Sequence, residues 1–153
     1  MKKRCNRKIW STAINPIAHA MAGASVVDDV SLNKLRLGEL SALESMTKGT
    51  GTVEDWRTLV DMMNIAETMG RHGIGPEVLP HCQTAQEGLQ TAARRYEKTK
   101  RMGLSGPTIQ ALREVYQYHD AQRTNISRSK YEQMIEKTRR ILINKPAGVV
   151  ELV

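Results

Sequence analysis

A chain of 153 residues is the right length for one domain with a single hydrophobic core. Its 40% hydrophobic and 25% charged residues are ordinary for a globular protein, and the absence of any run of about 18 apolar residues argues against a membrane span. The formal net charge of +7 fits an anionic partner and fits equally a solvated charged surface that only aids solubility.

The N-terminal part is predicted to be a basic arm followed by a short helix. Residues 1–10 contain five basic side chains and no acid, which predicts a flexible basic arm. Asn15 followed by Pro16 is typical of a helix start, because asparagine caps the first turn and proline fits into it. A short helix is therefore expected over 16–22.

Two helices are predicted in the next part of the chain. Apolar residues recur at helical spacing over 32–46, with Ser31 as the expected cap. Thr52 and Asp55 resemble a capping box, which predicts that the next helix runs over 53–71. The apolar stripe of this second helix is wide, so we expect it to be the most buried helix of the fold.

The longest helix is predicted over 76–102. Small or apolar residues recur there at alternating intervals of four and three residues, which is typical of a helix face that packs against other helices. Gly88 lies in the middle of this helix, where glycine costs about 1 kcal/mol relative to alanine. We therefore expect another helix to approach closely at Gly88, within the chain or across a dimer.

Two more helices are predicted before the end of the chain. Ser105, followed by Gly106-Pro107, predicts a helix over 108–123. Ser129 and Glu132 match a capping box, which predicts a last helix over 129–143.

The predicted fold class is therefore all-α, because strand signals are nearly absent. The expected architecture is a compact bundle of five main helices plus the short N-terminal one. The domain organisation that follows is a basic arm over 1–10, a single helical domain over 11–146 and an apolar tail over 147–153.

No catalytic or metal-binding pattern is found. His81 and Cys82 are adjacent, so on a helix their side chains point about 100° apart and cannot form one metal-binding face. Cys82 lies on the apolar seam, which argues against a nucleophile, and no glycine cluster matches a phosphate loop. With only Cys5 as a second cysteine, a disulfide is not expected. The sequence favours a non-enzymatic, cytoplasmic protein without metal or cofactor.

The charge is unevenly distributed along the chain. Residues 38–90 carry a net charge of −5, whereas residues 91–153 carry thirteen bases against six acids, a net charge of +7. A basic C-terminal half with a basic arm favours nucleic acid or a nucleoprotein complex of the host as partner. The residues expected to bind this partner are Lys2, Lys3, Arg4, Arg94, Arg95, Lys98, Arg101, Arg128, Lys130, Lys137 and Arg140.

Two alternatives stay open. The helices over 108–123 and 129–143 fit a DNA-binding helix-turn-helix or two antiparallel bundle helices, and a long connecting turn favours the bundle. The alternative to nucleic-acid binding is a helical scaffolding module that binds only protein, including a second copy of itself. Salt would discriminate, because phosphate contacts fade steeply with salt and hydrophobic association does not.

Three stretches within residues 46–123 carry a resemblance. They are Met46-Thr-Lys-Gly-Thr, Trp56-Arg-Thr-Leu-Val-Asp-Met-Met-Asn and Tyr116…His119-Asp-Ala-Gln. The chain resembles small uncharacterised helical accessory proteins carried by phages and prophages of proteobacteria. This resemblance implies a protein that acts by binding in the bacterial host cell: a regulator, or an inhibitor of defences such as CRISPR effectors. It brings no functional residues with it.

Overall fold

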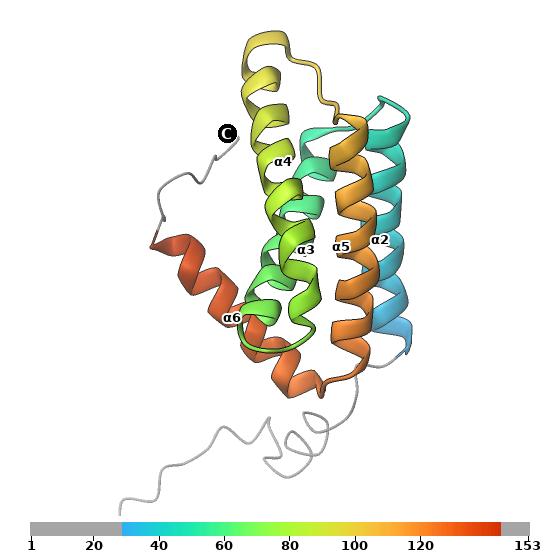
Figure 1. The fold of residues 1–153 in the computed structure, drawn as a ribbon. Coiled ribbons are helices and arrows are strands. Elements are labelled where there is room, and N and C mark those ends of the chain that lie inside the picture. Colours follow the sequence, from blue (N-terminus) through green and yellow to red (C-terminus); the bar gives the residue numbers. More distant parts are fainter. Residues whose placement is uncertain (1–28, 145–153) are drawn as a thin grey trace, which may run out of the picture.

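The computed structural model describes residues 29–144, which form an all-α fold without a β-strand in that range (Figure 1). The helices are α2 Asp29–Thr47, α3 Val53–Arg71, α4 Leu79–Thr99, α5 Gly106–Thr124 and α6 Arg128–Ile143, with one turn of 3-10 helix, η1 Pro76–Val78, before α4. The five predicted main helices are thus confirmed. The predicted arm over 1–10, the short helix over 16–22 and the tail over 147–153 lie outside the described residues.

Helices α2 to α5 run side by side with alternating direction, and α6 crosses the outer side of α3 at an angle (Figure 1). Helix α3 contacts α2, α4, α5 and α6, which explains why it buries more residues than any of its neighbours. Leu59, Ala66 and Met69 of α3 are completely buried. The prediction that this helix is the most buried one is confirmed for the described part of the chain.

The structure confirms the helix cap predicted at Thr52 and corrects two others. Thr52 accepts a hydrogen bond from the Asp55 amide at 3.2 Å, and the Asp55 carboxylate accepts one from the Thr52 amide at 2.8 Å, so the predicted capping box is confirmed. The caps predicted at Ser31 and Ser129 are wrong. Helix α2 already begins at Asp29, and Ser127 caps α6 by accepting from the Lys130 amide at 3.2 Å.

The predicted helix over 76–102 is shorter than expected at both ends. Residues 76–78 form the separate turn η1, and Gly75 before it adopts a left-handed conformation with φ of +58°. At the other end the helix stops at Lys100, whose φ is +56° and whose amide donates to the Tyr96 carbonyl at 2.8 Å. The side chain of Met102 is then buried, which holds the following turn against the core.

The structure confirms the close approach of another helix that was expected at Gly88. A Cβ atom at this position would lie 1.9 Å from Oγ1 and 2.3 Å from Cγ2 of Thr108, at the start of α5. Only glycine allows the backbones of α4 and α5 to come this close. The neighbour belongs to the same chain, so Gly88 needs no dimer to explain it.

A buried ion-pair network joins α2 to α5. The completely buried Arg123 donates to both carboxylate oxygens of Glu39, at 2.8 Å each, and Nη2 of Arg123 lies 3.0 Å from Asp120. Arg36 donates to both oxygens of Asp120, also at 2.8 Å. Burial opposes the charge of Asp120, but these arginine hydrogen bonds hold the pKa of its carboxyl below its usual range. The sequence prediction placed Arg123 only at a helix end and missed its burial.

His119 makes the stability of this region depend on pH. It is completely buried, and burial together with the nearby Arg123 charge lowers the pKa of its imidazole to about 4. In the unfolded chain the pKa of histidine is about 6.5, so between these values the unfolded state binds more protons. We expect the stability due to neutral His119 to be present above pH 6.5 and to fall by about 3 kcal/mol as the pH drops to 4.

Urea unfolding at pH 7, 5 and 4 measures this pH dependence. Because Asp120 also loses stability in acid, the comparison is with His119→Gln, which cannot be protonated in this range. The pH profile of the variant should be flatter than that of the wild type. Parallel profiles for the two proteins would show that His119 is not responsible.

Candidate polyanion-binding surface

The C-terminal half of α4 has a buried apolar face and an exposed basic face. Leu89, Ala92 and Ala93 are buried against the core, whereas Arg94 and Lys98 are exposed. A spacing of four residues places Arg94 and Lys98 on one face, about 6 Å apart along the helix axis.

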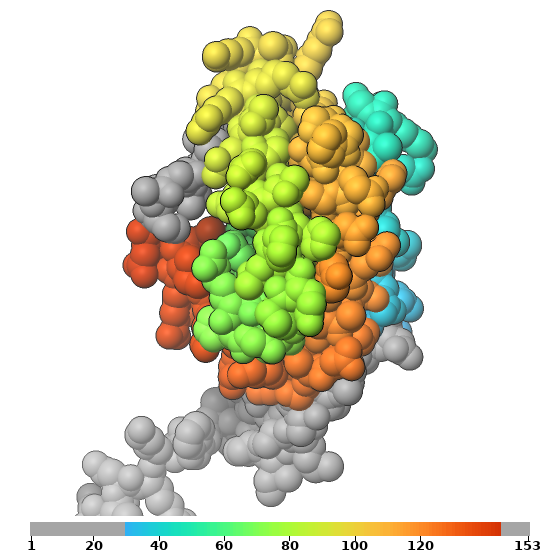
Figure 2. Space-filling view, viewed as in Figure 1, coloured from blue at the N-terminus to red at the C-terminus, as the bar shows by residue number. Residues whose placement is uncertain are grey.

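The turn after α4 contributes two more basic side chains and is attached to the helix by side-chain contacts. The Lys100 ammonium lies 5.5 Å from the centroid of the Tyr96 ring, which is a cation–π contact. Arg95 donates a hydrogen bond to the Gly103 carbonyl and so ties the helix to the turn. This segment forms the yellow tip at the upper end of the molecule (Figure 2). We name the set Arg94, Arg95, Lys98, Lys100 and Arg101 the α4 basic tip.

The cations of the α4 basic tip have no acidic partner within the described part of the chain. The ion pairs found among residues 29–144 involve none of the five. All five side chains are exposed, and Glu97 is the only acid between residues 91 and 101. Unpaired cations that share one exposed surface produce a positive potential that attracts anions.

The predicted binding residues on α6 differ from those on α4. Arg128 pairs with Glu132 at 3.0 Å and Arg140 with Glu136 at 3.2 Å, so acids on the same helix offset their charges. Lys130 and Lys137 are exposed. The beginning of α6 lies at the opposite end of the bundle from the α4 basic tip (Figure 1). The structure therefore divides the predicted residues between separate surfaces.

Lys2, Lys3 and Arg4 lie outside the described residues. Lys100 was not among the predicted binding residues, although its place in the basic run that begins at Arg94 is the signal that could have identified it.

The connection between α5 and α6 comprises residues 125–127 and is shorter than the sequence suggested. Helix α6 nevertheless buries Tyr131 and Met134 and packs mainly on α3. This packing on α3 is that of an additional helix on a bundle.

The side chains with nucleophilic or metal-binding potential are engaged in packing. Burial, reinforced by the Glu67 charge, raises the pKa of the Cys82 thiol to about 12, and its Sγ lies 3.9 Å from the Met63 carbonyl. His81 stacks on Tyr118 with ring centroids 5.4 Å apart. Among residues 29–144 no three His, Cys, Asp or Glu side chains are grouped as metal ligands, and none of the helices there could span a membrane.

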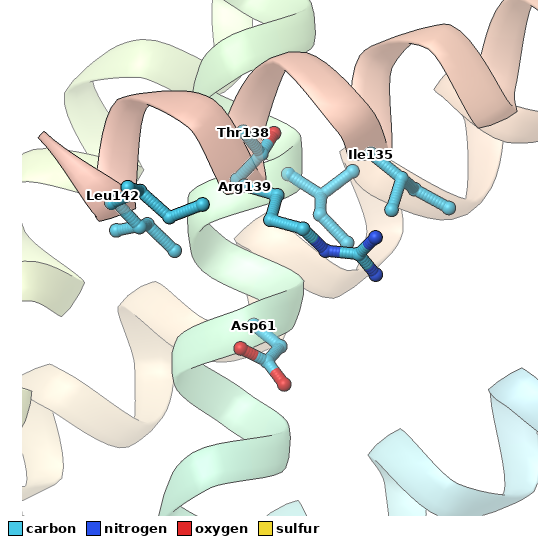
Figure 3. A pocket seen from close by; sticks show the side chains of 7 residues that line it. Asp61, Ile135, Thr138, Arg139 and Leu142 are labelled. Carbon is cyan, nitrogen blue, oxygen red and sulfur yellow. The ribbon is translucent and has the colours of Figure 1, made fainter.

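A groove between α3 and α6 is a second surface feature, and the sequence did not reveal it. Its volume is about 560 Å³. Along α6, Leu142 and Ile135 lie at its two ends with Arg139 between them, and Asp61 faces them from α3 (Figure 3). The groove arises because α6 crosses α3 at an angle, which depends on tertiary packing and has no local signal.

Comparisons with protein-family models, with curated proteins and with solved structures find no match to this chain. The class defined by the described residues is a four-helix bundle with an additional crossing helix. The resemblance to phage-borne proteins stays a prediction.

Proposed function

We propose that this protein is a non-enzymatic binding protein whose α4 basic tip engages nucleic acid or a nucleoprotein complex. The observation that carries the proposal is the placement of five cations within residues 94–101, on a fixed tip, without a carboxylate partner among the described residues. Such cations gain free energy from a phosphate backbone by releasing its condensed counterions. The basic arm over 1–10 would add a second contact to the same polyanion.

The biological setting is part of this proposal. An accessory role in a phage or prophage, exerted in the bacterial cytoplasm as a regulator or as an inhibitor of a nucleic-acid-guided defence, fits a small protein that acts by binding. This setting rests on the sequence resemblance alone.

Removing charge from the α4 basic tip should weaken binding to DNA and RNA. We expect the triple variant Arg94→Gln, Lys98→Gln and Arg101→Gln to bind at least about tenfold more weakly at moderate salt, because each lost phosphate contact also removes a released counterion. The slope of log affinity against log salt should fall by about 3 in magnitude. Fluorescence anisotropy with duplex DNA, single-stranded DNA and RNA between 50 and 200 mM salt measures both quantities.

A matched control removes the same charge elsewhere. Arg71, Arg128 and Arg139 each pair with an acid on their own helix, so changing all three to Gln should leave binding nearly unchanged. Thermal denaturation is measured in parallel, because cations near a helix C-terminus also stabilise the helix dipole. Equal loss in both triple variants would contradict a site at the tip. Absence of binding to DNA, RNA and nuclease-sensitive host complexes would contradict the proposed function.

A protein-only scaffolding function is the second candidate, and exposed apolar side chains on α2 favour it. Val30 is 75% exposed and Leu37 69% exposed, and their spacing of seven residues places them on one face of the helix. Association through this face would persist at high salt, unlike phosphate binding. Size-exclusion chromatography with light scattering at low and high salt tests it, and a monomer under both conditions would argue against self-association.

A further inference from the structure

Helix α6 presents a second cationic surface, apart from the α4 basic tip. The helix contains five basic and two acidic side chains. Glu132 pairs with Arg128 at 3.0 Å, and Glu136 pairs with both Arg139 and Arg140, at 3.4 and 3.2 Å. The three arginines therefore take up both acids of the helix.

The two lysines of α6 are left without an acid. Lys130 and Lys137 are exposed, and no ion pair found over residues 29–144 involves either of them. Seven residues make almost two full turns, so the two lysines lie on one edge of the helix, about 10 Å apart along its axis. Gln133 is exposed between them, and its amide can donate to a phosphate oxygen. We name Lys130, Gln133 and Lys137 the α6 lysine edge.

The α6 lysine edge is turned away from the groove between α3 and α6. Ile135 and Arg139 line this groove, and each is two residues from Lys137, which is about 160° around the helix. The groove opens toward Asp61, in the N-terminal half of α3 (Figure 3). Because α3 runs antiparallel to α4, the beginning of α3 lies at the same end of the bundle as the α4 basic tip (Figure 1). The α6 lysine edge therefore faces the other end.

The two cationic surfaces are also far apart. Lys130 lies in the first turn of α6, and the 19 residues of α5 separate it from the turn that follows the α4 basic tip. A helix of this length spans about 28 Å. Duplex DNA is stiff over about 150 base pairs, so a duplex that rests on one end of so small a protein does not curve around to the other.

We propose that the α6 lysine edge binds a second segment of duplex nucleic acid, so that one protein molecule bridges two duplexes. This inference rests on the proposed function, because the α4 basic tip holds the first duplex. Lysine contacts phosphate as a point charge and does not read bases in this way, so bridging is independent of sequence. Two unpaired lysines offer fewer phosphate contacts than the five cations of the tip, so the α6 lysine edge is the weaker site.

Bridging between two short duplexes tests the proposal. One duplex of about 12 base pairs, slightly more than a helical turn, is fixed to beads, and a fluorescent duplex of unrelated sequence is added with the protein. We expect the wild type to retain the fluorescent duplex at about 50 mM salt, where phosphate contacts are strong. Lys130→Gln with Lys137→Gln should lower this retention at least about fivefold, and should lower the affinity for one free duplex, measured by anisotropy, less than about twofold.

Arg128→Gln with Arg139→Gln is the matched control, because it removes two charges from the same helix that are already paired with acids. Retention by this control should stay close to that of the wild type. Equal loss in the two double variants would overturn the proposal. Retention that persists in the lysine variant would overturn it as well, because bridging would then come from the tips of two associated copies.

The stoichiometry of the complex provides a second measurement. Sedimentation with excess duplex should show two duplexes per wild-type chain and one per chain of the lysine variant, whereas Lys130→Arg with Lys137→Arg, which keeps both charges, should still bind two. A wild type that binds one duplex and does not bridge would overturn this inference and leave the proposed function intact. A wild type that binds no duplex at all would contradict both.

Discussion

Arg123→Met should reduce the free energy of unfolding by about 3–5 kcal/mol, the range found when one partner of a buried ion pair is removed. The guanidinium is completely buried and donates two 2.8 Å hydrogen bonds to Glu39, which is itself buried. Methionine fills a similar volume but leaves the Glu39 carboxylate without its partner in a site that excludes water. Small domains have about 5–15 kcal/mol of stability in total, so this single change should bring the protein close to unfolding.

Urea denaturation followed by circular dichroism measures the loss, and the surface offers a matched control. Arg128 forms an ion pair with Glu132 at 3.0 Å, and both side chains are at least half exposed. Exposed pairs contribute about 0–1 kcal/mol, so Arg128→Met should have little effect. Equal effects of the two substitutions would show that the buried pair does not hold α2 to α5.

The double variant Glu39→Met and Arg123→Met separates the value of the pair from the cost of leaving one partner alone. Replacing a whole buried ion pair by apolar residues is often neutral or stabilising. We therefore expect the double variant to recover most of the stability that Arg123→Met loses. A further loss in the double variant would mean that the charges themselves, including Asp120, are needed for the packing of α5.

This network also marks the limit of what the sequence could predict. Helix existence and several caps follow from local patterns, and Thr52 with Asp55 is an example in which one short segment contains the whole signal. The burial of Arg123 depends on Glu39, which is 84 residues away, and arginine on a helix is usually exposed. Only the packing of α2 on α5 brings the two together, so no local pattern could reveal them.

The candidate binding surface shows the same division between local and tertiary information. The basic run from Arg94 to Arg101 is local, so the sequence indicated it. Whether it joins the cations of α6 depends on the path of the chain, and the bundle places the start of α6 at the other end (Figure 1). The groove beside Asp61 is wholly tertiary, since residues from two helices with a crossing geometry form it.

Gly88→Ala should destabilise the protein, although alanine is normally the better helix residue by about 1 kcal/mol. The new methyl group would lie 1.9 Å from Oγ1, 2.3 Å from Cγ2 and 2.6 Å from Cβ of Thr108. All three distances are below contact, so α5 must move away from α4. Overpacking of this kind costs about 1–3 kcal/mol or more, and we expect it to outweigh the gain in helix propensity.

Gly38→Ala provides the matched control, because Gly38 lies within α2 and has no neighbouring atom within 4 Å of the added Cβ. There the same substitution should stabilise the protein by about 0.5–1 kcal/mol. The two variants thus test packing with opposite expected signs, measured as free energies of unfolding in urea. A stabilising Gly88→Ala would contradict the close approach of α4 and α5.

Thr108→Ala should rescue part of the loss caused by Gly88→Ala, because it removes the two nearest atoms, Oγ1 and Cγ2. Rescue remains partial, since the Cβ atoms of the two residues would still lie 2.6 Å apart and the Ser105–Thr108 hydrogen bond of 2.8 Å is lost. A favourable coupling energy in this double-mutant cycle would locate the strain at the Gly88–Thr108 contact. Strictly additive effects would place the strain elsewhere along α4.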